Sequence, residues 1–157
     1  MMPSLHRRLF LAGVLTSPVV IAATPGLAQG RTVWSAKEAY QALRADTARL
    51  IDVRSREEWR ETGVGAGIWP ISMHEDRFAE RLFAARDLAG DRTVGLICAT
   101  GGRSAALLGA LRKAGYANFA DISEGMLGSR RGPGWLATGL PVVPMETALA
   151  SLPDDLA

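Results

Sequence analysis

Short apolar runs typical of β-strands alternate along this chain with segments whose apolar side chains recur at helical spacing. One run, residues 50–54, reads Leu-Ile-Asp-Val-Arg, and another, residues 93–98, ends in the only cysteine of the protein. Segments 76–88 and 103–114 carry apolar side chains every three or four residues, as one face of a helix requires. This alternation predicts an α/β fold with a mainly parallel, five-stranded sheet and helices on both faces.

The predicted elements follow one another closely. We expect strands at residues 32–34, 50–54, 68–71, 93–98 and 119–122, and helices at residues 35–45, 56–59, 76–88 and 103–114. Ser35 and Ser55 each stand three residues before a glutamate, which is the capping-box pattern of a helix start. From Pro141 onward the chain shows no clear pattern, and we expect residues 145–157 to be an irregular C-terminal tail.

The N-terminus has the layout of a bacterial-type export signal. Arg7 and Arg8 precede an apolar segment at residues 9–23, and small residues follow it up to Ala28. We expect residues 1–28 to be a signal peptide that is cleaved. Because paired arginines stand before a Phe-Leu step, the segment resembles a twin-arginine signal, which implies a periplasmic or secreted protein.

A retained membrane anchor is the alternative for this segment. The apolar stretch is shorter than the roughly 20 residues of a span, and Gly13 and Pro18 interrupt it. We therefore expect residues 29–144 to form one folded domain that has no contact with a membrane after cleavage. The 18 basic and 16 acidic side chains nearly balance, and no basic stripe with interleaved aromatic residues occurs. This composition gives no support for a nucleic-acid partner.

The single cysteine, Cys98, has no partner for an internal disulfide. In an exported chain an odd cysteine indicates an intermolecular bond or a free reactive thiol. The alternative is a cysteine buried as a small apolar side chain. With one cysteine and one histidine, His74, after the signal, the chain lacks the ligands of a typical zinc site. We expect no metal and no cofactor.

The residues after Cys98 favour the reactive thiol. Four small residues, Ala99, Thr100, Gly101 and Gly102, connect the predicted strand to a predicted helix that begins at Arg103. The backbone amides of such a turn can form an anion-binding nest, and the helix N-terminus adds partial positive charge. A thiol in these surroundings, beside an arginine, is suited to ionise and act as a nucleophile.

The loop from Cys98 to Arg103 resembles the Cys-x4-Arg active-site loop of single-domain rhodanese-type sulfurtransferases. Further motifs of that family stand in the same order, and the resemblance covers residues 32–144. The matching segments are 50–54 with Glu58-Trp59, 65–70, 98–103, 124–126, Trp135 and 139–142.

The resemblance implies covalent sulfur transfer. The Cys98 thiolate would take the outer sulfur of a donor such as thiosulfate or another sulfane-sulfur compound as a persulfide. A small-molecule acceptor such as cyanide or a thiol, or a protein, would then remove it in a ping-pong reaction. Amides of Ala99 to Arg103 would stabilise the persulfide charge. Related phosphatases have a loop one residue longer, so the four-residue spacing favours sulfur over phosphate.

The sequence departs from the family inside the loop. Active thiosulfate-using members often carry a basic residue there, whereas this loop has the uncharged pair Ala99-Thr100. Donor binding would fall to Arg103, with Arg130 and Arg131 as further candidates, although a solvated pair of arginines explains these two equally well. The alternative function is a sulfur carrier or binding module without useful turnover.

Two charged residues at a predicted strand end, Asp52 and Arg54, are supporting candidates for the site. The carboxyl ends of parallel strands are where open α/β sheets bind ligands. Asp52 would hold Arg103 or a loop amide, or it would form an ordinary structural ion pair.

Overall fold

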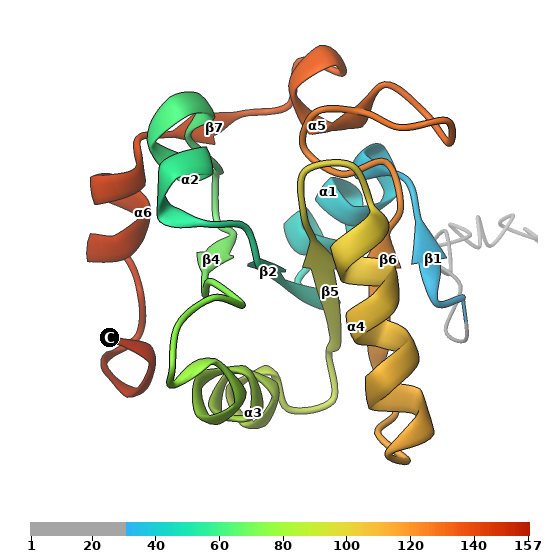
Figure 1. Ribbon diagram of the computed structural model, residues 1–157, viewed down its shortest axis with the longest axis vertical. Helices are drawn as coiled ribbons and strands as arrows, with labels where there is room; N and C mark the ends of the chain where they lie inside the picture. Colours follow the sequence, from blue (N-terminus) through green and yellow to red (C-terminus); the bar gives the residue numbers. More distant parts are fainter. Residues whose placement is uncertain (1–30) are drawn as a thin grey trace, which may run out of the picture.

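The computed structural model describes residues 31–157, so the expected signal peptide lies outside the described residues. Five strands form a parallel sheet in the order β1-β6-β5-β2-β4, and β3 pairs with β7 in a small antiparallel sheet (Figure 1). The strands are β1 (Val33–Trp34), β2 (Ala48–Asp52), β3 (Val64–Gly65), β4 (Trp69–Pro70), β5 (Thr93–Ile97), β6 (Phe119–Ile122) and β7 (Val142–Val143). The helices are α1 (Ala36–Arg44), α2 (Arg56–Thr62), α3 (Phe78–Ala89), α4 (Gly102–Lys113), α5 (Gly134–Ala137), α6 (Met145–Ala150) and a final 3₁₀ turn (Asp154–Leu156).

The parallel sheet separates two apolar cores, one on each of its faces. Helices cover both faces (Figure 1). On one face, buried residues of α3 and α4 such as Leu82 and Leu108 pack with Leu96 of β5. On the other face, α1 and α6 pack against Leu50 and Ile97. The parallel sheet covered by helices on both faces confirms the predicted fold class. Within residues 31–157, no helix combines the length and apolarity that a membrane crossing requires.

Both predicted capping boxes are present. The Ser35 and Ser55 hydroxyls accept hydrogen bonds from the backbone amides of Glu38 and Glu58, and each glutamate accepts one from the backbone amide of its serine. Reciprocal bonds of this kind satisfy free amides of the first helical turn. The box at Ser55 also fixes the position of Glu58 at the start of α2.

The C-terminal segment is not the irregular tail that the sequence suggested. Residues 145–150 form α6, and the final 3₁₀ turn buries the side chain of Leu156. Arg81 of α3 holds this turn, because its Nε and Nη2 atoms donate to the Leu156 carbonyl at 2.9 and 2.6 Å. The prediction was wrong because such short elements carry little periodicity and depend on a partner 75 residues away in the chain. Residues 145–157 therefore belong to the folded domain.

Candidate active site

Cys98 lies directly after the central strand β5, at the turn that leads into α4. Its side chain is buried, and the Sγ atom accepts a hydrogen bond from the Gly101 amide at 3.2 Å. The Ser104 hydroxyl, in the first turn of α4, stands 3.4 Å from the same sulfur. Within residues 31–157 these two groups are the hydrogen-bond donors to the thiol, so of the amides expected from Ala99 to Arg103 only that of Gly101 contacts it.

The left-handed conformation of Gly101 allows this contact. Its φ of +85° is one that other residues rarely adopt. A side chain at this position would also place its Cβ 2.2 Å from the Ser123 carbonyl oxygen. The glycine therefore lets the loop curl tightly over Cys98 while it packs against the segment that follows β6.

The segment 123–127 holds the loop from the other side. The amides of Met126 and Leu127 donate to the carbonyls of Cys98 and Ala99 at 2.9 and 2.8 Å. Gly125, with φ of +69°, allows the close approach, because a Cβ there would lie 2.3 Å from the Ala99 oxygen. These bonds give a structural reason for the Glu-Gly-Met motif recognised in the sequence.

Arg103 carries the positive charge nearest to the loop, and Glu58 of α2 holds it in place. Its Nη1 and Nη2 atoms lie 2.8 and 2.5 Å from the two carboxylate oxygens. The bonds from Arg103 are the main reason that the pKa of Glu58 falls to about 2. The same pair raises the pKa of Arg103. His74, an exposed side chain, places its Nε2 atom 3.5 Å from Nη1.

Asp52 does not hold Arg103 or a loop amide, so that expectation was wrong and its structural alternative holds. The Asp52 carboxylate accepts from the side chain of Arg54, with Nη2 and Oδ2 at 2.8 Å, and from the Arg54 amide. Both residues are buried. Arg54 also donates to Thr62 and to the Gly63 carbonyl, each at 2.8 Å. This pair ties the end of β2 to the end of α2, and within residues 31–157 neither side chain forms a hydrogen bond with Cys98 or Arg103.

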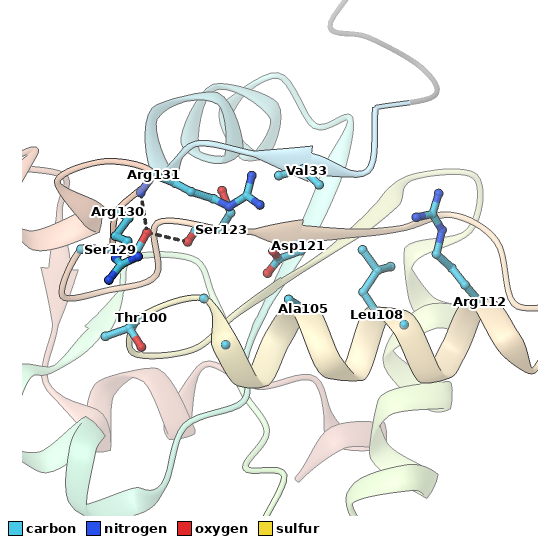
Figure 2. A pocket seen from close by; sticks show the side chains of 14 residues that line it. Val33, Thr100, Ala105, Leu108, Arg112, Asp121, Ser123, Ser129, Arg130 and Arg131 are labelled. Carbon is cyan, nitrogen blue, oxygen red and sulfur yellow. Dashed lines mark hydrogen bonds between the residues drawn. The ribbon is translucent and has the colours of Figure 1, made fainter.

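Arg130 and Arg131 do lie near the loop. Both line a groove of about 640 Å³ that shares Thr100, Gly101 and Gly102 with the loop around Cys98 (Figure 2). Both side chains are exposed, on the segment between β6 and α5. The structure therefore brings them to the edge of the candidate site, as the sequence suggested, but not into contact with the sulfur.

Two residues, one at the thiol and one in the groove beside the loop, were not predicted from the sequence. Ser104 directly follows the arginine of the loop motif, and its place in the first helical turn was the available signal. Asp121 is a buried charged residue in the otherwise apolar strand β6, and it lines the groove. An aspartate inside a buried strand needs an explanation, and this signal was present in the sequence.

Among the described residues, no group of three or more side chains of the metal-binding types could hold an ion.

The chain is an α/β protein with a parallel five-stranded sheet, and its cysteine stands at the turn after the central strand β5. The chain matches the Rhodanese-like domain family over residues 35–130, and it is a member of that family. An uncharacterized protein of Rickettsia rickettsii, the RP600 homolog, is 29% identical over 110 residues, which cover 61% of this chain and 83% of the relative.

Solved structures of other proteins have a similar fold. Rv0390 from M. tuberculosis is 28% identical with a TM-score of 0.51, and the match covers 69% of this chain and 94% of that one. A rhodanese-related protein from Thermoplasma volcanium is 27% identical with a TM-score of 0.51, and the match covers 72% of this chain and 97% of that one. The fold is therefore the rhodanese-like α/β fold that the motifs predicted.

Proposed function

We propose that this protein is a sulfurtransferase that moves a sulfane sulfur from a donor to a nucleophilic acceptor through a persulfide on Cys98. The observation that carries the proposal is the position of the Cys98 sulfur. It sits in a tight turn at the start of α4, where the Gly101 amide donates to it and the Ser104 hydroxyl lies 3.4 Å away, within reach of both the sulfur and the Gly101 carbonyl. Donors directed at a sulfur stabilise negative charge on it, which both a thiolate and a persulfide carry.

The first half-reaction loads the sulfur. With thiosulfate as donor, the Cys98 thiolate attacks the outer sulfur and forms a new S–S bond. The bond between that sulfur and the sulfonate breaks, its electron pair leaves with sulfite, and Cys98 carries a persulfide. Arg103, held by Glu58, supplies the positive charge that attracts the donor anion, and the exposed guanidiniums of Arg130 and Arg131 stand at the edge of its approach.

The second half-reaction unloads the sulfur onto an acceptor from outside. Cys98 is the only cysteine of the chain, so no internal thiol resolves the persulfide. Cyanide or a thiol attacks the outer sulfur, and Cys98 leaves as a thiolate. The two steps share one covalent intermediate, which predicts ping-pong kinetics.

A sulfur carrier without useful turnover is the second candidate. Two observations favour it: the uncharged Ala99-Thr100 pair, and the burial of Cys98, of which 1% is exposed. A carrier would take up one sulfur and release it only to a specific protein. Intact mass after donor treatment, combined with turnover, separates the cases. A gain of one sulfur atom without multiple turnovers favours the carrier, and no gain favours a binding module.

Cyanolysis assays test the enzymatic proposal. We expect thiocyanate formation from thiosulfate or from an organic thiosulfonate, and no formation above background by Cys98→Ala. Comparison of the two donors shows whether the loop without internal charge accepts the inorganic anion. Turnover by wild type that equals that of Cys98→Ala with both donors would overturn the proposal.

We also propose that the protein acts outside the cytoplasm, on the strength of its N-terminal sequence. Replacement of Arg7 and Arg8 by lysine should abolish export by the twin-arginine route and leave full-length protein in the cytoplasm. A variant that is still exported and shortened like wild type would contradict the twin-arginine route, and a wild-type protein that stays full-length in the cytoplasm would contradict the export signal itself.

A further inference from the structure

A groove beside the Cys98 loop combines an acidic floor, apolar sides and a basic rim. Asp121 of β6 faces α4 across it, and Ala105 and Leu108 of α4 form an apolar wall (Figure 2). Thr100 and the two glycines after it form the end that the groove shares with the loop. We call this feature the Asp121 groove. Its volume of about 640 Å³ suits a small molecule.

The Asp121 carboxyl has an unmet hydrogen-bonding need. It is 4% exposed, and within residues 31–157 its Oδ1 atom has no hydrogen-bond partner. Ser123 donates to the Trp34 carbonyl at 3.3 Å and Ser129 donates to the Ser123 carbonyl at 2.9 Å. The Ser104 hydroxyl lies 3.3 Å from the Gly101 carbonyl and 3.4 Å from the Cys98 sulfur, and among the described residues it too leaves Oδ1 without a donor. Burial raises the pKa of Asp121, and the Ser104 hydroxyl and the Arg131 charge lower it in part. A buried acceptor without a donor destabilises the protein, so a ligand that brings an N–H donor gains affinity there.

The rim has the opposite charge. Arg130 and Arg131 lie at the end of the groove near Thr100, and Arg112 lies at the other end (Figure 2). In the part of the chain that the structure describes, the guanidinium groups of these three arginines form neither a hydrogen bond nor an ion pair with another side chain. Guanidinium groups pair well with carboxylates. An anion at the floor and cations at the rim fit a ligand that carries both charges.

We propose that the Asp121 groove binds a zwitterionic aminothiol as the sulfur acceptor, with its ammonium group at Asp121 and its carboxylate at Arg130 and Arg131. This inference rests on the proposed function. The acceptor's thiolate attacks the outer sulfur of the Cys98 persulfide. The S–S bond to Cys98 breaks, its electron pair returns to Sγ, and the outer sulfur leaves as the persulfide of the acceptor. The exchange needs no oxidant or reductant.

Acceptors that differ in one group test the role of Asp121. L-cysteine has the ammonium group, N-acetyl-L-cysteine lacks it, and cyanide has neither an ammonium nor a carboxylate group. The variant Asp121→Asn keeps the shape and removes the carboxylate. We expect kcat/KM with L-cysteine to fall about tenfold or more in the variant, as for loss of a hydrogen bond to a charged group. The values with N-acetyl-L-cysteine and cyanide should stay within about twofold. An equal fall for all three acceptors, or no fall with L-cysteine, would overturn the inference.

The rim is tested with a matched arginine. The measurement starts from protein whose Cys98 already carries the sulfur, so that donor binding does not enter. Unloading of the double variant Arg130→Ala/Arg131→Ala by L-cysteine should need more acceptor than unloading of wild type, whereas cysteamine, which lacks the carboxylate, should unload both equally well. Arg44→Ala removes an exposed arginine that does not line the groove, and it should leave both acceptors unaffected. Equal effects of the double variant on L-cysteine and cysteamine would contradict the assignment of the carboxylate.

A binding measurement separates this inference from the proposed function. Cys98→Ser removes the chemistry, and S-methyl-L-cysteine keeps the zwitterion without a thiol. Calorimetric titration should show binding to Cys98→Ser and at least tenfold weaker binding when Asp121→Asn is added. If this difference is found while wild type shows no sulfur transfer, the proposed function fails and the ligand class of the groove stands. If sulfur transfer is found but S-methyl-L-cysteine does not bind, the groove assignment fails alone.

Discussion

Arg103, at the end of the cysteine loop, and Glu58, in the first turn of α2, form a bidentate ion pair with N–O distances of 2.8 and 2.5 Å. The pair joins two segments 45 residues apart in the chain. A pair with two parallel bonds fixes the orientation of the guanidinium as well as its position. Because Glu58 is itself set by the capping box at Ser55, the start of one helix determines where the charge beside Cys98 stands.

Removal of Glu58 should weaken donor use. In Glu58→Gln, Arg103 keeps its charge but loses its charged partner, so the guanidinium is free to leave the loop. We expect kcat/KM for an anionic donor to fall about tenfold, or about 1.4 kcal/mol of transition-state stabilisation. Steady-state kinetics with thiosulfate or an organic thiosulfonate measure this. The exposed control Glu80→Gln should retain full activity, and equal kinetics for the two variants would contradict the role of the pair.

The same pair should make stability depend on pH in a defined direction. The pKa of Glu58 is about 2 in the folded protein, against a usual value of 4.5. A lowered carboxyl pKa stabilises the folded state fully above the usual value, and this contribution is lost as the pH falls toward 2. Urea unfolding of wild type and Glu58→Gln should therefore give a difference that shrinks from about pH 5 to about pH 2. A difference that stays constant over this range would show that Glu58 is not held in this way.

The Asp121 carboxyl should affect the pH dependence of stability in the opposite direction to the Glu58 carboxyl. Burial raises the pKa of Asp121 above its usual 3.8, so the folded state favours the neutral carboxyl. The ionised group destabilises the fold at neutral pH, and this effect disappears below the usual pKa, where the group is protonated in both states. We expect Asp121→Asn to be more stable than wild type at neutral pH and equal to it below pH 3.8. Thermal unfolding across this range provides the check. A variant that is less stable than wild type at neutral pH would show that the Asp121 carboxylate is stabilised in the folded protein, which contradicts the account of a buried carboxylate oxygen without a hydrogen-bond donor.

The C-terminal turn should contribute to stability as a part of the core. Leu156 is fully buried in the apolar cluster that also contains Leu82 and Leu108. Leu156→Ala should lower the free energy of unfolding by about 2–5 kcal/mol, as for other buried leucines. Leu127, which is 53% exposed, provides the control, and its replacement by alanine should change stability by less than about 0.5 kcal/mol. Equal effects of the two changes in urea unfolding would mean that the C-terminal turn is not docked.

The sequence predicted the elements whose patterns are local. The five strands of the parallel sheet, the two capping boxes and the turn after Cys98 were all identified from residues that are neighbours in the chain. Glycines in the loop and in the Glu-Gly-Met motif also pointed to close backbone approach, and the structure shows what approaches them.

The contacts that the sequence did not reveal join distant segments. Glu58 was recognised as part of a capping box, but its pairing with Arg103 depends on how α2 lies against the loop. Asp52 was considered for the same arginine, yet it pairs with Arg54 two residues away. The docking of Leu156 on Arg81 and the position of Asp121 under α4 likewise follow from packing and not from periodicity.

The most direct test of sulfur transfer is the intact mass of the protein before and after treatment with a sulfane-sulfur donor. We expect wild type to gain the mass of one sulfur atom, cyanide to remove it with formation of thiocyanate, and Cys98→Ala to gain nothing. A wild-type protein whose mass does not change with thiosulfate or with an organic thiosulfonate would contradict the persulfide on Cys98.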